Sequence, residues 1–520
     1  MKRLLALILS FAMLLIVVLM AGCDGSEETT SGTTPAGETT SSSGGTGEQG
    51  ETTGSSGGNE TTGTTAPSDT TGSSALSWDE MDPYAKPAGF EDVDFGGRKF
   101  VIAAYIGADG WESNKEIYSD GADSISVAVR ARNDAMEKLY NCTIELNESE
   151  GPGALVTADI TGGQHTIDMY CQKYNLGGLV TSGSNYDLYT LGIDLENPWY
   201  DQTYIETYSL KDQTGNVELY SVIGDWAISC FEAAHAMVYN KSVYENAGIE
   251  DDIYQLVRDK EWTMDKFMEM VKKAAVESSG NSEYHYSEGD IMGWVRTGHA
   301  THGLHVASGL SIMKNEDGSL IFSVLDDSAA WNDVIETAIS VWSMPEGETL
   351  GYTDVRLAME GGKTLFASEV LAILEIMKDS DVSVGLVPYP LYSESQENYA
   401  HYADNHLMPY SVPISVPDPQ VVGEFMEVFG FHSRYIVRAA WIEAYSYEYC
   451  SDADSAEMLD LILDTRTYDP GYLYYANYEG QISNMISSGS NSVTKFAERY
   501  AATAAESVAT LIESMTTANS

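Results

Sequence analysis

Residues 224–275, GDWAISCFEAAHAMVYNKSVYENAGIEDDIYQLVRDKEWTMDKFMEMVKKAA, decide the expected fold. The stretch opens with a Gly-Asp turn and an apolar run, and a strand then ends at the sequence VYNK, residues 238–241. The helix that follows is closed by Gly248, because glycine readily adopts the left-handed conformation that ends helices. A second helix begins after Trp262, with Thr263 as its cap and one apolar face. Periodicity alone therefore predicts strand, helix, loop and helix.

The order of these motifs is more informative than any one of them. Gly-Asp, then Tyr-Asn-Lys, Ala-Gly and Trp-Thr-x-Asp-x-Phe resembles the extracellular solute-binding proteins (family 1 type) of bacterial ABC importers. The resemblance extends from about residue 95 to about residue 475. It implies an α/β, two-lobed, periplasmic-binding-protein-like type II fold, in which each lobe is a mainly parallel sheet flanked by helices and a hinge joins the lobes.

The resemblance also implies a function. Such a protein captures a small polar solute, here a carbohydrate (oligosaccharide), between its lobes and delivers it to ABC permease subunits. It performs no covalent chemistry, needs no cofactor and acts as a monomer. Acidic patches on the two lobes are expected to dock on basic permease loops. A peptide or another polar solute stays an alternative ligand.

Strand and helix patterns alternate in the first half of the chain. Predicted strands at 99–106, 142–146 and 167–171 alternate with helices that begin at Ser124 and Ala154. This alternation favours right-handed βαβ units and a mainly parallel sheet. Ligands of such sheets bind beyond the carboxyl ends of the strands.

The chain divides into six expected segments. They are a signal peptide with a lipobox (1–23), a disordered linker (24–75), the first part of lobe I (76–225), the first part of lobe II (226–383), a return to lobe I (384–432), and a helical C-terminal part that packs on the lobes (433–520). Strands at 217–223 and 384–390 are expected to cross between the lobes. The interleaving makes each lobe from two separate pieces of chain.

The N-terminus reads as an export signal followed by a tether. Lys2 and Arg3 precede an apolar run at 4–20, and Ala-Gly-Cys23 then resembles a bacterial lipobox whose cysteine carries the lipid, palmitate included. An uncleaved membrane anchor is the alternative. Residues 24–75 are mostly Ser, Thr, Gly and Glu and cannot form a core. We expect a lipid-anchored protein on the extracellular face of the cell membrane, in a Gram-positive organism.

The net charge of −52 is the most unusual feature of the composition. A surface with this much negative charge repels nucleic acid and anionic lipid head groups. We therefore expect no nucleic-acid partner. Cys142, Cys171, Cys230 and Cys450 lie far apart and form no C-x-x-C pair. Cys142 and Cys171 fall on strands that could be neighbours, which leaves a disulfide and buried free thiols both open.

Two motifs suggest other chemistry. Gly361-Gly362-Lys363-Thr364 resembles part of a phosphate-binding loop, but the first glycine of that motif is replaced by Leu357, so we expect a helix-to-strand turn. His299, His302 and His305 are spaced three apart and could share one side of a helix. Gly298 and Gly303 weaken that helix, and we expect no metal site there.

Aromatic and polar residues near the predicted crossings are the candidate ligand-binding residues. Sugar rings stack on indole and phenol faces, while their hydroxyls hydrogen-bond to carboxylates and amides. The aromatic candidates are Trp199, Trp226, Trp294, Tyr389 and Tyr410, and the polar candidates are Asp225, Asn240, Glu369 and Asn405. For each of them, core packing or helix capping is the competing interpretation. A secreted glycoside hydrolase and a surface polysaccharide-binding adhesin remain the alternative functions.

Overall fold

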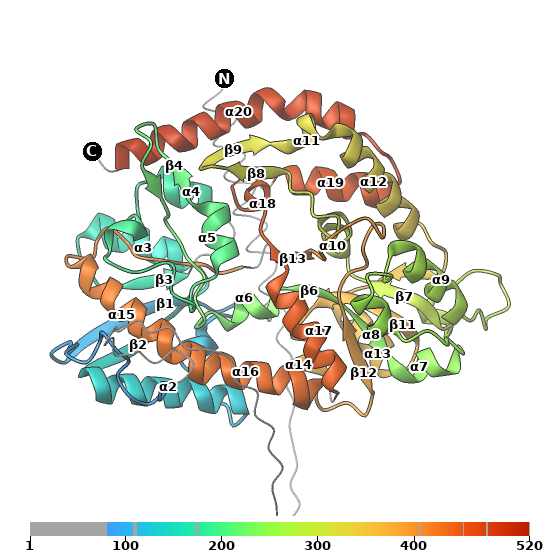
Figure 1. Cartoon of the computed structure of the whole chain (residues 1–520), viewed down its shortest axis with the longest axis horizontal. Coiled ribbons are helices and arrows are strands. Elements are labelled where there is room, and N and C mark those ends of the chain that lie inside the picture. Colours follow the sequence, from blue (N-terminus) through green and yellow to red (C-terminus); the bar gives the residue numbers. More distant parts are fainter. Residues whose placement is uncertain are drawn as a thin grey trace, which may run out of the picture. The chain divides into compact units, whose positions relative to one another are not determined.

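Two β-sheets, each flanked by helices, organise the described part of the chain (Figure 1). The computed structural model describes residues 81–107, 112–171, 173, 176–404, 407–450, 452–474 and 477–518. Cys23, the predicted linker at 24–75 and the candidate Asn405 lie outside the described residues. The two sheets define two lobes, called lobe I and lobe II below.

Lobe I contains a four-stranded sheet in the order β14-β3-β1-β2. Strand β1 pairs in parallel with β2 and β3, and β14 pairs antiparallel with β3. The strands are β1 (Arg98–Tyr105), β2 (Cys142–Ser149), β3 (Met169–Cys171) and β14 (Tyr410–Ser411), and the helices are α2 (Ser124–Tyr140), α3 (Pro152–Gly162), α4 (Leu176–Thr181) and α5 (Gln202–Tyr208). Because β14 comes from far along the chain, lobe I is built from two separate segments.

Lobe II contains a five-stranded sheet in the order β10-β7-β11-β6-β12. Its strands are β6 (His235–Asn240), β7 (Met292–Arg296), β10 (Gly347–Thr349), β11 (Thr364–Val370) and β12 (Val384–Val387). Its helices are α7 (Lys241–Asn246), α8 (Ile253–Arg258), α9 (Met264–Ala274), α10 (Ala300–Val306), α11 (Ser323–Asp326), α12 (Ser328–Trp342), α13 (Tyr352–Glu360), α14 (Ala372–Met377), α17 (Ala453–Asp464) and α19 (Asn477–Ser488). Thr263 caps α9 by accepting a hydrogen bond from Lys266 N, as predicted.

Three small two-stranded sheets and four short helices complete the connections. The sheets pair β4 (Leu210–Lys211) with β5 (Val217–Glu218), β8 (Met313–Glu316) with β9 (Ser319–Phe322), and β13 (His401–Tyr402) with β15 (Arg466–Thr467). The short helices are η2 (Asn114–Glu116), η3 (Leu188–Thr190), η4 (Tyr286–Glu288) and α18 (Pro470–Leu473). The β8–β9 hairpin of lobe II reaches lobe I, where Lys211 N donates to the Gly318 carbonyl.

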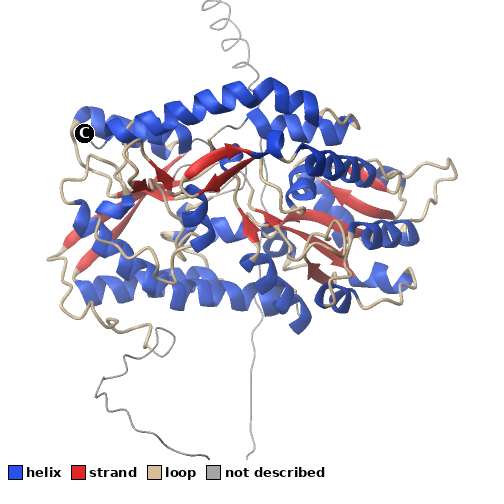
Figure 2. Ribbon diagram, turned by 45° about the horizontal axis from the view of Figure 1, so that its top comes forward, coloured by secondary structure: helices blue, strands red, loops and turns tan. Residues whose placement is uncertain are grey.

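Several segments cross between the lobes. The first leads into α6 (Ile228–Glu232), and Val222 pairs there with Tyr410 on the returning chain. A long helical run then passes from lobe I to lobe II through α15 (Pro419–His432), the π-helical turn η5 (Ser433–Arg438), α16 (Ala439–Glu443) and the π-helical turn η6 (Ala444–Tyr449). Helix α20 (Val493–Ala518) lies along the opposite side in Figures 1 and 2, and it contacts α12 of lobe II and α4 of lobe I.

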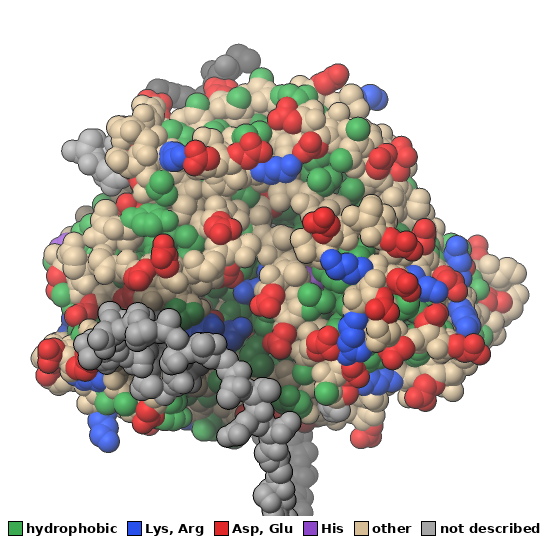
Figure 3. Space-filling view, viewed as in Figure 1, with side chains coloured by type: hydrophobic (Ala, Val, Ile, Leu, Met, Phe, Trp, Pro, Cys, Tyr) green, Lys and Arg blue, Asp and Glu red, His purple; other side chains and the backbone are tan. Residues whose placement is uncertain are grey.

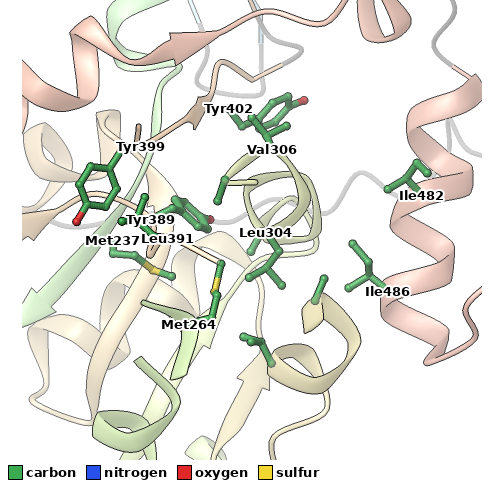
Figure 4. Close-up of a cluster of buried hydrophobic side chains, with 14 of the residues drawn as sticks. Met237, Met264, Leu304, Val306, Tyr389, Leu391, Tyr399, Tyr402, Ile482 and Ile486 are labelled. Atoms are coloured by element: carbon green, nitrogen blue, oxygen red, sulfur yellow. The ribbon is translucent and has the colours of Figure 1, made fainter. Parts of the chain in front are cut away.

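Apolar side chains fill both lobes. In lobe I, Phe100 stacks on Phe425 with ring centroids 4.0 Å apart. In lobe II, a larger cluster includes Met237, Tyr389 and Leu391, which lie together in Figure 4. A further cluster joins Ile125 and Val129 of α2 to side chains of lobe II and of the long helical run. The lobes therefore share apolar contacts close to the crossing.

The two-lobed α/β fold expected from the sequence is confirmed, with local differences. The lobe II sheet is mixed, not mainly parallel as expected, because β6 pairs antiparallel with both β11 and β12, whereas β10, β7 and β11 are parallel. Only Val217–Glu218 of the predicted strand 217–223 is a strand, because it pairs in a hairpin with β4. Strand β12, expected to lead back to lobe I, is an edge strand of the lobe II sheet and pairs with β6. Residues 361–364 form the predicted turn from α13 into β11.

The four cysteines of the described chain are buried free thiols. Cys142 begins β2 and Cys171 ends β3, and β1 lies between these strands, so the possible disulfide between them does not form. Among the described residues, no helix combines the length and the apolar character that crossing a membrane requires.

Candidate functional site

A cavity of about 500 Å³ is lined by both lobes and by the crossing between them. Lobe I contributes the loop after β1 and the start of α2, the crossing contributes α6, and lobe II contributes α14. The polar side chains that line it include Glu112, Lys115, Glu116, Ser119, Asp123, Ser126, Ser229, Glu232 and Glu375. Cavities of this size commonly hold small solutes, and a cavity shared by two lobes changes shape when the lobes move.

The start of α2 fixes the lobe I wall. Asp123 caps the helix, because its Oδ1 accepts a hydrogen bond from Ser126 N at 2.8 Å and its Oδ2 accepts one from Ser126 Oγ at 2.7 Å. Ser119 Oγ lies 2.8 Å from Ser126 Oγ, and Arg130 donates to the carbonyl oxygens of Ser119 and Gly121. The preceding loop is thereby tied to the helix, which fixes the direction of its side chains.

Glu116 is a buried side chain that lines the cavity. Its Oε1 accepts a hydrogen bond from the Tyr410 hydroxyl at 2.5 Å, and its Oε2 accepts one from Ser229 N at 2.8 Å. The side chain therefore links β14 of lobe I to α6 of the crossing. Burial raises the pKa of Glu116 to about 7, although the hydrogen bonds from Tyr410 and Ser229 work in the opposite direction.

Glu232 lies at the end of α6, between the lobes. The Trp441 indole and the Tyr445 hydroxyl both donate to its Oε1, at 3.3 and 3.2 Å. Burial raises the pKa of Glu232 to about 8, and the negative charge of Glu375 adds to that rise. The described residues donate no hydrogen bond to Oε2, so this oxygen is available to a solute.

Helix α14 forms the lobe II wall, and its charges act across the cavity. Glu375 lies 3.6 Å from Lys378 on the same helix, and Ile376 presents an exposed apolar side chain. The Lys378 ammonium also influences lobe I: burial raises the pKa of Asp123, but the Ser126 hydrogen bonds and the charge of Lys378 together bring it below its ordinary value. A charge beside the lobe II wall therefore affects the ionisation of a side chain on the lobe I wall.

The aromatic candidates lie in the cores of the lobes. Trp199 and Trp226 have no exposed surface and pack in lobe I, Trp199 against Phe431. Trp294 donates from its indole to Ser368 Oγ at 2.7 Å within lobe II. Their ring faces are covered by neighbouring side chains, so core packing accounts for these three tryptophans.

The two candidate tyrosines differ in their relation to the cavity. Tyr389 is buried in the lobe II cluster beside Leu391, as Figure 4 shows. Tyr410 is equally buried, but its hydroxyl holds Glu116, which lines the cavity. Tyr410 therefore contributes to the site by positioning a carboxylate, and its ring face is not open to a solute.

The described polar candidates have separate partners. Asp225 pairs with Arg434 at 2.8 Å and with Arg438 at 3.3 Å, at the crossing. Asn240 caps α7 by accepting from Val243 N, and its amide donates to the Met359 carbonyl. Glu369 is buried at the carboxyl end of β11, where burial raises its pKa to about 7. Of the eight candidates that the structure describes, none lines the cavity directly.

The three spaced histidines do share a helical segment, but each has its own partner. His299 Nδ1 lies 3.4 Å from Asp404, His302 Nε2 lies 2.9 Å from Glu479, and His305 Nε2 lies 2.9 Å from the Tyr472 hydroxyl. No group of three or more His, Cys, Asp or Glu side chains within the described residues could hold a metal ion.

The side chains that line the cavity were not predicted from the sequence. Glu116, Ser229 and Glu232 were not among the candidates, although the last two lie within the stretch 224–275. Glu232 carried a usable signal, because it is an isolated carboxylate in the run Cys-Phe-Glu-Ala-Ala at the predicted crossing. A charge at such a position is costly unless it is paired or serves a ligand.

Comparison with known proteins supports the fold. No protein-family model matches the sequence, and no curated protein matches it. Among solved structures, a cyclo/maltodextrin-binding protein complexed with maltotetraose matches with a TM-score of 0.50 at 13% identity, over 80% of this chain and 96% of the other.

Two further solved structures match the chain over most of its length. A family 1 extracellular solute-binding protein from Bifidobacterium longum subsp. infantis has a TM-score of 0.49 at 15% identity and covers 79% of this chain and 100% of its own. The ABC substrate-binding protein Lmo0181 from Listeria monocytogenes, in complex with cycloalternan, has a TM-score of 0.47 at 12% identity and covers 81% and 99%. The match to the cyclo/maltodextrin-binding protein shows that the chain shares its two-lobed fold.

Proposed function

We propose that this chain is the solute-binding component of an ABC importer. It captures a small polar solute, a carbohydrate of the oligosaccharide class, in the cavity between its lobes and presents it to permease subunits. The observation that carries the proposal is the 500 Å³ cavity, because lobe I, α6 and α14 all contribute to its walls. A solute bound there contacts both lobes at once and favours the lobe arrangement that encloses it.

The polar lining suits a sugar. Hydroxyl groups donate hydrogen bonds to carboxylates and accept them from Ser hydroxyls and backbone amides. Ser119, Ser126 and Ser229 line the cavity beside the carboxylates of Glu116 and Glu232. Of the residues predicted from the sequence, we propose supporting roles for Tyr410, which holds Glu116, and for Glu369, which precedes α14.

The anchor and the partners belong to the same proposal. Cys23 would carry the lipid, and the linker at 24–75 would hold the lobes away from the membrane surface. Acidic side chains are spread over the face shown in Figure 3, with Lys and Arg among them. That distribution is compatible with docking on basic permease loops through both lobes.

Binding of oligosaccharides to the purified chain tests the proposal. A solute at one hundred times its dissociation constant stabilises the native state by about 2.7 kcal/mol, which raises the melting temperature measurably. We expect a shift with one class of oligosaccharide, a one-to-one titration and recovery of the sugar unchanged. Glu394→Gln is a matched control for cavity variants, because Glu394 is exposed and lies outside the cavity.

The same experiment separates the alternatives. A cleaved sugar would replace the importer proposal with a glycoside hydrolase, in which two of the cavity carboxylates would act as acid and base or nucleophile. Binding of long polymers without any change in lobe arrangement, measured by small-angle scattering, would favour an adhesin. Absence of binding to every oligosaccharide would remove the carbohydrate from the proposal.

A further inference from the structure

The charged side chains of the cavity are strongly unbalanced. Five carboxylates line it, those of Glu112, Glu116, Asp123, Glu232 and Glu375, against a single cation, Lys115. They come from lobe I, from α6 and from α14, so the imbalance belongs to the whole cavity. A neutral sugar would leave this excess of carboxylates uncompensated.

Three of these carboxylates have partners that account for them. Glu112 lies 3.4 Å from Lys115, whose side chain is 70% exposed. Glu375 pairs with Lys378 on its own helix, and Asp123 caps α2. The charges of Glu112 and Glu375 are therefore compensated by lysines, and the Asp123 carboxylate accepts the capping hydrogen bonds of α2.

Glu116 and Glu232 differ from them. Within the described residues, neither carboxylate lies within 4.0 Å of a Lys, Arg or His nitrogen. The charge of buried Arg132 lowers the pKa of Glu116, but its Nη2 donates to the backbone carbonyls of Glu116 and Ile117, and it forms no ion pair with the carboxylate. Taking a carboxylate out of water without a cation costs free energy, and a positive charge placed beside it recovers much of that cost.

The two carboxylates also influence each other. The charges of Glu375 and Glu116 both add to the effect of burial on Glu232, whose pKa is about 8. Repulsion between nearby carboxylates favours proton uptake, and a bound cation reverses that preference. The cavity is thus arranged to gain from a ligand that brings positive charge.

A second observation points to a ligand at the same place. Ser229 lines the cavity and is only 3% exposed, and its Oγ lies near the Glu116 carboxylate without forming a well-aligned hydrogen bond to any described residue. Ser229 N donates to Glu116, and Ser229 lies three residues before Glu232 on α6. A buried hydroxyl without a partner is costly, and a polar ligand group beside it would remove that cost.

We propose that the solute carries an ammonium group, which binds beside Glu232 and Glu116 with Ser229 as an additional hydrogen-bonding partner. This inference rests on the proposed function for the class of solute, which then becomes an amino sugar with a free amine. The ammonium donates to Glu232 Oε2, the oxygen that Trp441 and Tyr445 leave open. Anionic sugars are excluded, because their carboxylates would face five carboxylates of the protein.

Matched sugars test the proposal on the purified chain. The probes are the β-1,4 disaccharide of glucosamine, its N-acetylated form, the disaccharide of galacturonic acid, and spermidine as a cation that is not a sugar. Isothermal titration at pH 7 is expected to give at least tenfold tighter binding of the free amine than of its N-acetylated form, and no binding of the acidic sugar.

Variants show whether the selectivity arises in the cavity. Glu232→Gln keeps an acceptor for Trp441 and Tyr445 but removes the charge, so the preference for the free amine is expected to fall at least tenfold while N-acetylated sugar is bound as before. Glu375→Gln, at the more exposed lobe II wall, is a second variant with a smaller expected effect. Glu394→Gln is expected to leave the preference unchanged.

The outcomes separate this inference from the proposed function. Equal or tighter binding of the N-acetylated sugar would overturn the ammonium site and leave sugar binding in place. Binding of spermidine alone, lost in Glu232→Gln, would support the ammonium site and overturn the carbohydrate. Failure of all four probes to bind would overturn both, and an amine preference that persists in both variants would place the charge recognition elsewhere.

Discussion

Two groups of buried or half-buried carboxylates lie where the lobes meet, and they differ in their hydrogen-bond and ion-pair partners. At the crossing, Asp225 pairs with Arg434 and Arg438, and Asp201 pairs with Arg466 at 2.8 Å. In the cavity, Glu116 and Glu232 accept hydrogen bonds from neutral groups only. The same chemical group forms ion pairs with guanidinium at one place and forms none at the other.

We interpret the carboxylates at the crossing as structural and those in the cavity as available to a solute. Guanidinium groups at the crossing fix Asp225 and Asp201 to the long helical run and to β15, which holds the segments between the lobes in register. Burial raises the pKa of Asp225, and Arg438 and Arg434 oppose that rise. The cavity carboxylates have no salt bridge that opposes the effect of burial, so they hold their protons to a higher pH, and a solute that brings positive charge favours their ionised form.

The largest expected effect is loss of the crossing ion pairs. Asp225→Ala leaves Arg434 and Arg438 without their shared carboxylate, whose side chain is 10% exposed. Removal of one partner from a buried ion pair costs about 3 kcal/mol or more. Urea denaturation measures the cost.

An exposed pair provides the control for that variant. Glu457 pairs with Arg258 and its side chain is 52% exposed, so Glu457→Ala is expected to cost less than about 1 kcal/mol. If Asp225→Ala destabilises the protein no more than Glu457→Ala does, the crossing ion pairs do not hold the lobes, and the contrast with the cavity fails.

The next largest effect is expected on the free energy of unfolding of the protein without bound solute. In the folded protein the pKa of Glu232 is about 8, so the side chain stays protonated up to about that pH. In unfolded chains it loses its proton near the ordinary pKa of Glu. Fewer protons are then bound in the unfolded state, so the free energy of unfolding falls as pH rises between those two values. Glu232→Gln removes this slope and is expected to stabilise the empty protein at pH 8 by about 1–2 kcal/mol.

Urea denaturation at pH 5, 6.5 and 8 measures that slope. The variant is expected to gain most at pH 8 and little at pH 5, while Glu394→Gln follows the unaltered protein throughout. A loss of stability in Glu232→Gln at pH 8 would show that the Glu232 carboxylate is already satisfied in the empty protein, contrary to the comparison above.

The smallest effect is expected at the single cation of the cavity. Lys115 is 70% exposed, so solvent screens its charge and its pair with Glu112 contributes little. Lys115→Gln is expected to tighten binding of the glucosamine disaccharide by no more than about threefold, because ion pairs so exposed contribute about 0–1 kcal/mol. Weaker binding in this variant would mean that Lys115 itself contacts the solute.

The sequence predicted the fold better than the site, for a physical reason. Motif order in 224–275 carried the resemblance that implied two lobes, and the alternation of strands and helices and the cap of α9 are local patterns that could be predicted directly. Asn240 also had a local meaning, since Asn before a helix is a common cap, and that is its role at α7. Both results depend on neighbours along the chain.

The cavity depends on contacts that a local pattern does not contain. Glu116 and Tyr410 are 294 residues apart in sequence, and Glu232 meets Trp441 across 209 residues. The tryptophans at the crossing were predicted as stacking surfaces, but apolar rings at a junction of two cores gain more by burial, and Trp199 and Trp226 are fully buried. The isolated charge of Glu232 was a usable signal in the sequence, but Glu232 was not among the predicted site residues.

A crystal structure of the chain with the glucosamine disaccharide would show where the sugar binds and what its amine contacts. We expect the sugar between α2, α6 and α14, with its ammonium nitrogen within hydrogen-bonding distance of Glu232 Oε2, about 2.7–3.2 Å. A sugar bound outside this cavity, or one whose amine points away from Glu232 and Glu116, would contradict this expectation.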